Sequence, residues 1–228
     1  MNYTQLSDAI QAYAENTESN FVAEIPVFVQ QAEQRIYNSV QFPSLRKNVT
    51  GSTTTGNKYL SLPLDFLAVY SFAVVTGVVG GDINTGTYES LLNKDVNFIR
   101  QAYPTPDDTG VPRYYALFGP TVTSGTITNE LTFIMGPTPD AVYDVELHYY
   151  YYPESIVTAN TSWLGDNFDT VLLYGSLVEA YTYMKGEQDM MALYNQKYME
   201  ALTLAKRLGD GMERQDAYRS GQFRQAVT

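Results

Sequence analysis

Apolar residues near the start of the chain recur at the spacing of one helix face. Five of them follow one another at steps of three or four residues: Ile25, Val29, Ala32, Ile36 and Val40. This spacing predicts a helix over residues 24–39, with Pro26 in its first turn, where a helix tolerates proline. Leu6 and Ile10 predict a shorter helix before it, capped by Thr4. Two helices are therefore expected to open the chain.

The helical spacing disappears beyond residue 42, where glycine, threonine and β-branched residues become frequent. Residues 51–57 join two short stretches that can pair as a β-hairpin. The apolar run over residues 59–75 predicts a strand that is buried on both faces. Residues 90–102 predict a short helix, because their apolar residues fall on one side before Pro104.

Apolar and polar residues alternate in three stretches of the centre, over residues 114–118, 131–135 and 143–151. Alternation with a period of two is typical of strands with one buried face. The connecting segments contain Gly-Pro pairs, which favour turns. We therefore expect antiparallel strands in this part of the chain.

Helical spacing returns in the last third. Apolar residues recur at steps of three and four over residues 173–184 and again over residues 194–208, which predicts two helices. Glycines at positions 209 and 211 are expected to interrupt the second helix. The residues that follow are polar, and we expect them to form an arm that can detach from the fold.

Together these elements predict an α+β fold. N-terminal and C-terminal helices form a helical bundle beside an antiparallel β-sheet or small β-sandwich, with an extended C-terminal arm. Four segments are expected: N-terminal helices over residues 1–41, an antiparallel β region with a short inserted helix over 42–160, C-terminal helices that pack with the N-terminal ones over 161–208, and the arm over 209–228.

The composition excludes several classes of function. The 228 residues include no cysteine and one histidine, and the formal net charge is −11. Disulfide scaffolds, thiol catalysis, zinc fingers, iron–sulfur clusters and multi-histidine metal sites are excluded by this composition, and no cofactor is expected. The acidic balance argues against tight, sequence-independent DNA binding, because basic side chains supply that affinity.

The chain also lacks the features of membrane and secreted proteins. No stretch is long and apolar enough to span a bilayer. The first residues lack the basic and apolar blocks of a signal peptide. We therefore expect synthesis in the cytoplasm and no membrane partner.

One row of residues has the chemistry of a catalytic site. Asp144, Glu146 and His148 occupy alternate positions of a predicted strand, so they share one face at intervals of roughly 7 Å. Two carboxylates at such a distance can serve glycoside hydrolysis. The same row is typical of the solvent side of any half-exposed strand, and no phosphate-binding or nucleophile motif accompanies it. A structural role is the stronger interpretation.

Two features favour contacts with other macromolecules. The chain has 20 tyrosines and one tryptophan, and tyrosine buries its ring while keeping its hydroxyl solvated, as many interfaces require. Arg46, Lys47 and Lys58 lie beside Tyr59 in a stretch without acidic residues. Basic groups interleaved with an aromatic ring are typical of a nucleic-acid path, and equally of the exposed face of a hairpin.

The order of several short motifs carries a resemblance that no single motif would. The chain resembles the head-to-tail adaptor family of short-tailed double-stranded DNA phages, also described as tail tubular protein A-like or head-completion proteins. The segments that carry it are the early helix at 25–37, residues 59–67 before a long strand, residues 111–115 at the start of the next sheet segment, residues 136–139 before the strand at 143–153, and Trp163-Leu164 before paired helices.

The resemblance implies a structural protein without enzymatic activity. It implies a dodecameric ring beneath the portal protein in the virion neck, made in the host bacterial cytoplasm, with double-stranded DNA passing through the centre without sequence-specific binding. By the same resemblance, the β loops receive the tail nozzle, a tail tubular protein B-like partner, and the C-terminal helix and arm bind the portal. The expected portal contacts are Tyr198, Leu202, Lys206, Arg207, Arg214, Tyr218, Arg219, Phe223 and Arg224.

Two other functions stay open at this point. A carbohydrate-binding or glycan-degrading tail component would use the row of Asp144, Glu146 and His148. A tail terminator or another neck protein of a long-tailed phage would share the structural role but not the partners. Arg46, Lys47 and Lys58 are expected to contact the tail or the DNA channel under the adaptor interpretation.

Overall fold

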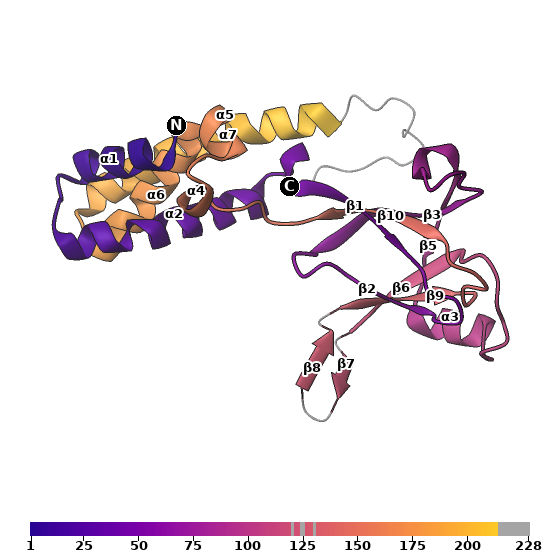
Figure 1. Cartoon of the computed structure of the whole chain (residues 1–228). Coiled ribbons are helices and arrows are strands. Elements are labelled where there is room, and N and C mark those ends of the chain that lie inside the picture. Colours follow the sequence, from indigo (N-terminus) through magenta and orange to yellow (C-terminus); the bar gives the residue numbers. More distant parts are fainter. Residues whose placement is uncertain (120, 124–125, 130, 214–228) are drawn as a thin grey trace. The chain divides into compact units, whose positions relative to one another are not determined.

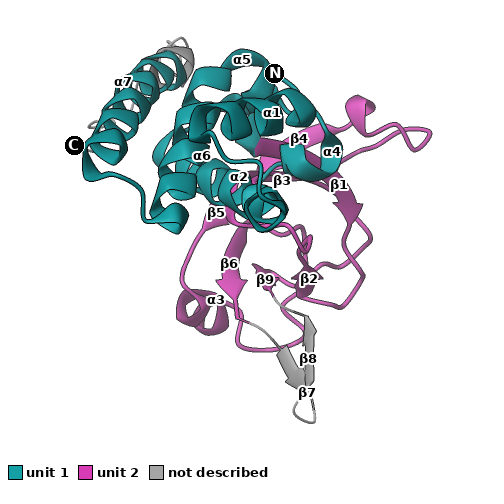
Figure 2. Ribbon diagram, turned by 90° about the vertical axis from the view of Figure 1, so that its left-hand side faces the viewer, with its two compact units in different colours: residues 1–45, 152–228 teal, residues 46–151 magenta. Residues whose placement is uncertain are grey.

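The structure is a computed structural model that describes residues 1–119, 121–123, 126–129 and 131–213, with the backbone alone at 121–123, 126–129 and 210–213. The chain forms two compact units (Figure 2). The helical unit contains residues 1–45 and the chain from residue 152 onward, and the β unit contains residues 46–151. The chain thus changes units at residues 45/46 and 151/152, whereas the sequence placed the changes at 41/42 and 160/161.

The helical unit is built around one central helix (Figure 1). Its elements are α1 (Tyr3–Ala14), α2 (Ser19–Ser39), a 3₁₀ turn (Pro43–Leu45), α4 (Ile156–Ala159), α5 (Trp163–Asn167), α6 (Asp169–Met184) and α7 (Gln188–Glu213). Helix α6 packs against α1, α2, α5 and α7. Gly175 allows this close packing, since a Cβ atom there would lie 3.2 Å from both Ala32 Cβ and Tyr198 Cε2.

Both N-terminal helices begin elsewhere than the sequence predicted. Helix α1 is capped by Asn2, not Thr4: the Asn2 side chain accepts from the Gln5 backbone N–H, and the Gln5 side chain accepts from the Asn2 N–H. Helix α2 begins at Ser19, five residues before the predicted start. Phe21 is buried and continues the apolar face by one turn, which leaves Pro26 inside the helix.

The β unit contains two four-stranded sheets and a separate hairpin (Figure 1). The first sheet has the order β1-β10-β3-β4, the second has the order β2-β9-β6-β5, and β7 pairs with β8. The elements are β1 (Arg46–Ser52), β2 (Tyr59–Ser61), β3 (Ala68–Thr76), a 3₁₀ turn (Ile83–Thr85), β4 (Thr87–Ser90), β5 (Leu92–Asn93), α3 (Val96–Ala102), β6 (Tyr114–Phe118), β7 (Thr121–Thr123), β8 (Thr126–Asn129), β9 (Thr132–Gly136) and β10 (Asp144–Tyr150).

The two sheets pack face to face, so the predicted α+β fold contains a small β-sandwich. Its core takes residues from both sheets: Phe66, Phe72, Val74, Leu91, Tyr115, Phe133, Met135, Val145, Leu147 and Tyr149. Helix α3 covers the other side of the second sheet, where Ile99 packs with Ala116 and Ile134. Strand β9 is therefore buried on both faces, in contrast to the single buried face that its alternation predicted.

Three expectations for the β region are wrong. The stretches around residues 51–57 do not pair as a hairpin, because β1 pairs with β10 and β2 pairs with β9. The run over residues 59–75 is not one strand buried on both faces, since its two parts enter different sheets and β3 exposes Ala68 and Ser71. The inserted helix begins at Val96, because Ser90 ends β4 and residues 92–93 form β5, which runs parallel to β6.

The predicted interruption of the last helix does not occur. Helix α7 continues through Gly209 to Glu213. A Cβ atom at Gly209 would lie 2.9 Å from the Gln41 carbonyl oxygen, so glycine is needed here for close packing. The helical part of the predicted arm is thus residues 209–213, and the remainder of the arm lies outside the described residues. Among the described residues, no helix has the length and apolarity needed to cross a membrane.

Candidate functional site

Helix α7 presents two different faces. Its inner face packs on α6 and is buried along most of its length, with Tyr194, Tyr198, Ala201, Leu202 and Ala205. Two expected portal contacts, Tyr198 and Leu202, are only 3% and 5% exposed and therefore serve the core of the helical unit. The most apolar face of a surface helix usually packs against the helix's own fold. This face therefore does not identify the residues that contact another protein.

The remaining expected contacts divide into two groups. Lys206 and Arg207 are exposed on α7. The others lie outside the described residues: Arg214, Tyr218, Arg219, Phe223 and Arg224. Of the expected contacts on α7, the two basic residues are therefore exposed and the two apolar residues are buried.

A second side of α7 exposes apolar residues that are not among the expected portal contacts. Leu193, Leu204 and Leu208 are 44%, 64% and 47% exposed, and their spacing of eleven and four residues places them along one side of the helix. We call these three residues the outer stripe. Lys197 and Glu200, which form an ion pair at 3.3 Å, interrupt it and hide its periodicity in the sequence.

A polar depression lies between α2 and α6. It has a volume of about 300 Å³, and its lining residues are Gln31, Gln34, Arg35, Asn38 and Glu179. Arg35 and Glu179 form an ion pair across it. The buried hydroxyl of Tyr198 has no hydrogen-bond partner within the described chain, and burial raises its pKa, with Arg35 opposing and Glu179 adding to the shift. The lining is polar throughout, and its one carboxylate, Glu179, is engaged by Arg35.

Lys47 is held by neighbours within the β unit. Its Nζ lies 2.8 Å from Asp65 Oδ2 and 5.2 Å from the centre of the Tyr151 ring. The Tyr149 hydroxyl donates to Asp65 Oδ1 at 2.8 Å. The hydrogen bond from Lys47 lowers the pKa of Asp65, and the same contact raises the pKa of Lys47.

The other two basic residues also lie against aromatic rings. The Arg46 guanidinium is 4.3 Å from the centre of the Tyr70 ring, and Lys58 Nζ is 5.8 Å from that of Tyr59. Arg46 and Lys47 are adjacent on β1 and so point to opposite faces of the first sheet, whereas Lys58 precedes β2 of the second sheet. The three predicted contact residues therefore do not form one basic patch.

The row of Asp144, Glu146 and His148 does share one face of β10, as predicted. The contacts of the row lie within the sheet. His148 Nε2 is 3.1 Å from Glu146 Oε1, and the Ser52 hydroxyl donates to Asp144 at 3.1 Å. Partial burial and then the charge of Glu146, to which it hydrogen-bonds, raise the pKa of Tyr88 on β4. Within the described parts of the chain, no cluster of histidine and acidic residues is able to hold a metal ion.

The tyrosines are divided between the interior and the surface. Tyr37, Tyr115, Tyr149, Tyr194 and Tyr198 are buried within the two units. Burial, followed by a hydrogen bond to Tyr181, raises the pKa of Tyr194 to about 12. Five others remain exposed: Tyr13, Tyr59, Tyr88, Tyr152 and Tyr183. The tyrosine surplus is thus partly a requirement of the core and only in part a surface feature.

The family comparison covers both units together. A model described as "SU10 adaptor protein" matches residues 1–225. No curated protein matches the chain. Because the match runs through the helical unit, the β unit and back into α7, it concerns the chain as a whole and not one of its parts.

Proposed function

The chain belongs to the SU10 adaptor protein family, whose members are structural adaptors of phages, and we propose that it is the head-to-tail connector of its virion. In this proposal, copies of the chain form a dodecameric ring in the neck, beneath the portal protein. The ring joins the capsid vertex to the tail nozzle and lines the DNA exit channel. The observation that carries the proposal is the family match over residues 1–225.

The proposed portal contact is the outer stripe of α7. Leu193, Leu204 and Leu208 expose apolar surface that association would remove from water, at a gain of about 25 cal/mol per Å². Lys206 and Arg207 stand on the same helix and add positive charge. The portal contact also includes the expected anchors of the arm, which are Arg214, Tyr218, Arg219, Phe223 and Arg224.

The charge of the chain suits a channel through which DNA passes. A net charge of −11 repels a polyanion and keeps it from adhering to the wall. Arg46 and Lys47 remain proposed tail or channel contacts together with Lys58, but each already has a ring or a carboxylate beside it. The expected interaction with DNA is therefore transient and independent of sequence.

The portal contact is tested by charge substitutions on α7. Leu204→Glu with Leu208→Glu places two carboxylates in the outer stripe, and binding to purified portal rings is expected to weaken about tenfold or more, the equivalent of 1.4 kcal/mol. The matched control is Ala192→Glu with Thr203→Glu, which adds the same charge on an exposed but different side of α7. This control is expected to bind as the unaltered protein does.

Three results would reject parts of the proposal. Equal weakening by both double variants would show that charge alone, and not the outer stripe, controls binding. An unaltered chain that never binds portal rings, even in excess, would reject the connector function. Binding to a tail protein of a long-tailed phage, in place of the short-tailed nozzle, would retain the structural role. It would assign the chain to the neck of a long-tailed phage.

A further inference from the structure

The first sheet ends in two open edges. Among the strands that the structure describes, β1 has a partner on one side only, and so does β4 at the other end of the sheet. Residues 47–52 of β1 and all four residues of β4 are exposed. At both edges, backbone N–H and C=O groups are directed outward, where they can pair with another strand.

Strand β1 lacks the usual protection of an edge. Natural sheets keep edge strands short, or mark them with proline, bulges or free charges. Strands β2, β4 and β5 are short, with three, four and two residues, but β1 has seven residues and no proline. The irregularity of this sheet lies between His148 and Tyr149, on the side of β10 that faces β3. Lys47, the charge nearest the centre of β1, is already paired with Asp65.

Val49 indicates that the edge is incomplete. It is paired with Leu147 of the core, so it lies on the sandwich side of the sheet, yet it is 36% exposed. A further strand beside β1 would cover the open flank of this side chain. An aliphatic residue on the core side of a sheet is otherwise buried by the next strand.

The strand directions identify β4 of a second copy as a suitable partner. The four strands alternate in direction from β1 through β10 and β3 to β4, because each neighbouring pair is antiparallel. A second copy in the same orientation would therefore place its β1 antiparallel to β4 of the first. The contact uses two different surfaces, so it propagates around a cyclic ring, whereas pairing of β1 with itself would stop at a dimer.

Face and charge select one register. Glu89 pairs with Val74 and Lys47 pairs with Tyr149, so both lie on the sandwich side of the sheet. Strand β1 carries two basic residues and no acid, and β4 carries one acid and no base. Placing Lys47 opposite Glu89 gives its ammonium group, which has three donors and directs one to Asp65, a second carboxylate. It also keeps each residue on its own face and sets Val49 opposite Thr87.

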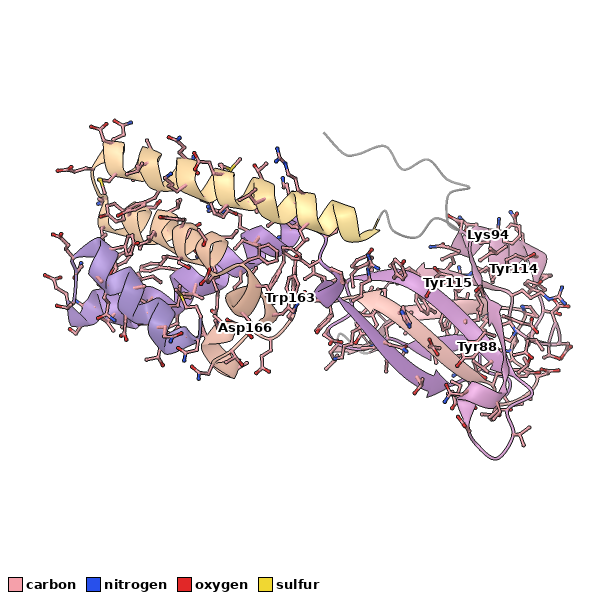
Figure 3. All side chains as sticks on the ribbon, turned by 90° about the horizontal axis from the view of Figure 1, so that it is seen from above. Tyr88, Lys94, Tyr114, Tyr115, Trp163 and Asp166 are labelled. Carbon is pink, nitrogen blue, oxygen red and sulfur yellow. The ribbon has the colours of Figure 1, made fainter. Side chains whose placement is uncertain are left out.

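We infer that β4 of each subunit pairs antiparallel with β1 of the next, with Lys47 opposite Glu89, so that the first sheet continues across the subunit boundary. This inference rests on the proposed ring and adds the contact that closes it. Tyr88, which lies on β4 (Figure 3), would then stand on the other face of the sheet beside Asn48 of the next subunit.

Cysteine crosslinking tests the register directly, because the natural chain has no cysteine. The test variant carries Val49→Cys and Thr87→Cys, and the control carries Val49→Cys and Ser90→Cys, which lie on opposite faces. Within one subunit β1 and β4 are three strand spacings apart, about 14 Å, which is too far for a disulfide. Across the proposed boundary the Cβ atoms of Val49 and Thr87 would be about 5 Å apart.

The variants are assembled on portal rings and oxidised mildly, and their covalent products are separated by size without reductant. The mass of the assembly in a reduced sample shows whether rings formed. We expect the test variant to give a ladder of covalent multimers, about tenfold more abundant than in the control, because only opposite positions come within disulfide range. Intact rings without this ladder would overturn the inference and leave the ring in place. Dimers from Val49→Cys alone would overturn it in favour of β1 pairing with itself. Absence of any ring would reject the proposed function and the inference together.

Discussion

The hydroxyl of Tyr149 donates a hydrogen bond to Asp65 Oδ1 over 2.8 Å. Tyr149 is buried in the sandwich core, and Asp65 lies in the turn between β2 and β3. Since Lys47 on β1 occupies the second oxygen of the same carboxylate, one side chain connects three separate stretches of the β unit. The aspartate of the motif at residues 59–67 thus has a structural role.

We expect Asp65→Ala to lower the free energy of unfolding by about 1–3 kcal/mol, because it leaves the buried Tyr149 hydroxyl without an acceptor. Tyr149→Phe removes the hydroxyl itself, so no buried donor is left without an acceptor. It should lower the free energy of unfolding by only about 0.5–1.5 kcal/mol. The double variant should cost less than the sum of the two. Denaturant unfolding of the four proteins measures this cycle, and strict additivity would show that the two groups do not act together.

Glu33 predicts a pH dependence of the helical unit. The residue is 3% exposed, its carboxylate accepts the Ile156 N–H at 2.9 Å, and burial raises its pKa above the ordinary 4.5. The folded state therefore binds a proton more readily than the unfolded chain. Stability relative to Glu33→Gln should rise as the pH falls from 7 toward 4.5 through the raised pKa. Glu33→Ala should cost about 1–3 kcal/mol at pH 7, because the buried Ile156 N–H loses its acceptor.

The fluorescence of Trp163 provides the measurement for Glu33. It is the one tryptophan of the chain and lies in the helical unit, with ring centres 5.0 Å from Phe42 and 5.5 Å from Phe168. Unfolding curves of the unaltered protein and Glu33→Gln are compared at several pH values. A difference that stays constant, or that shifts in favour of the glutamine variant as the pH falls, would be inconsistent with a raised pKa.

Gly209→Ala separates helix propensity from packing. In an exposed helix this change stabilises by about 1 kcal/mol. Here the new methyl group would lie 2.9 Å from the Gln41 carbonyl oxygen, so we expect a net loss of stability. Thermal unfolding gives the sign, and a higher melting temperature for the variant would show that α7 does not pack closely on residue 41.

Glu146→Gln tests the enzymatic alternative. Glu146 Oε1 lies 3.1 Å from His148 Nε2, and the charge of Glu146 acts on Tyr88 of β4, so its interactions stay within the first sheet. We expect the unaltered protein to release no sugar from host glycans, and the variant to assemble into virions normally. Glycan cleavage by the unaltered chain that disappears in Glu146→Gln would instead establish a catalytic role for this row.

Local periodicity predicted the helices and strands, and the faces they bury, because these depend on residues that are close together in the sequence. The alternation over residues 143–151 identified β10 and the side chains it buries, and the helical spacing over residues 173–184 identified α6. Strand partners were not predictable in the same way. Arg46 pairs with Tyr150, which is more than a hundred residues away, and nothing in the segment around residue 50 distinguishes this partner from a hairpin.

The exposure of residues on α7 was harder to predict from the sequence than the positions of helices and strands. The spacing of Tyr198 and Leu202 shows that they share a helix face, but it does not tell whether the chain itself or a partner covers that face. The outer stripe is weaker in the sequence because Lys197 and Glu200 divide it. Gly209 was interpreted as a helix break, since a requirement for close packing becomes visible only when residue 41 is placed beside it.

Imaging of the neck in mature virions tests the central claim most directly. We predict density for this chain as a closed ring between the portal and the tail, with α7 in contact with the portal. Particles that contain the chain elsewhere, or mature infectious particles that lack it, would contradict the proposed connector function.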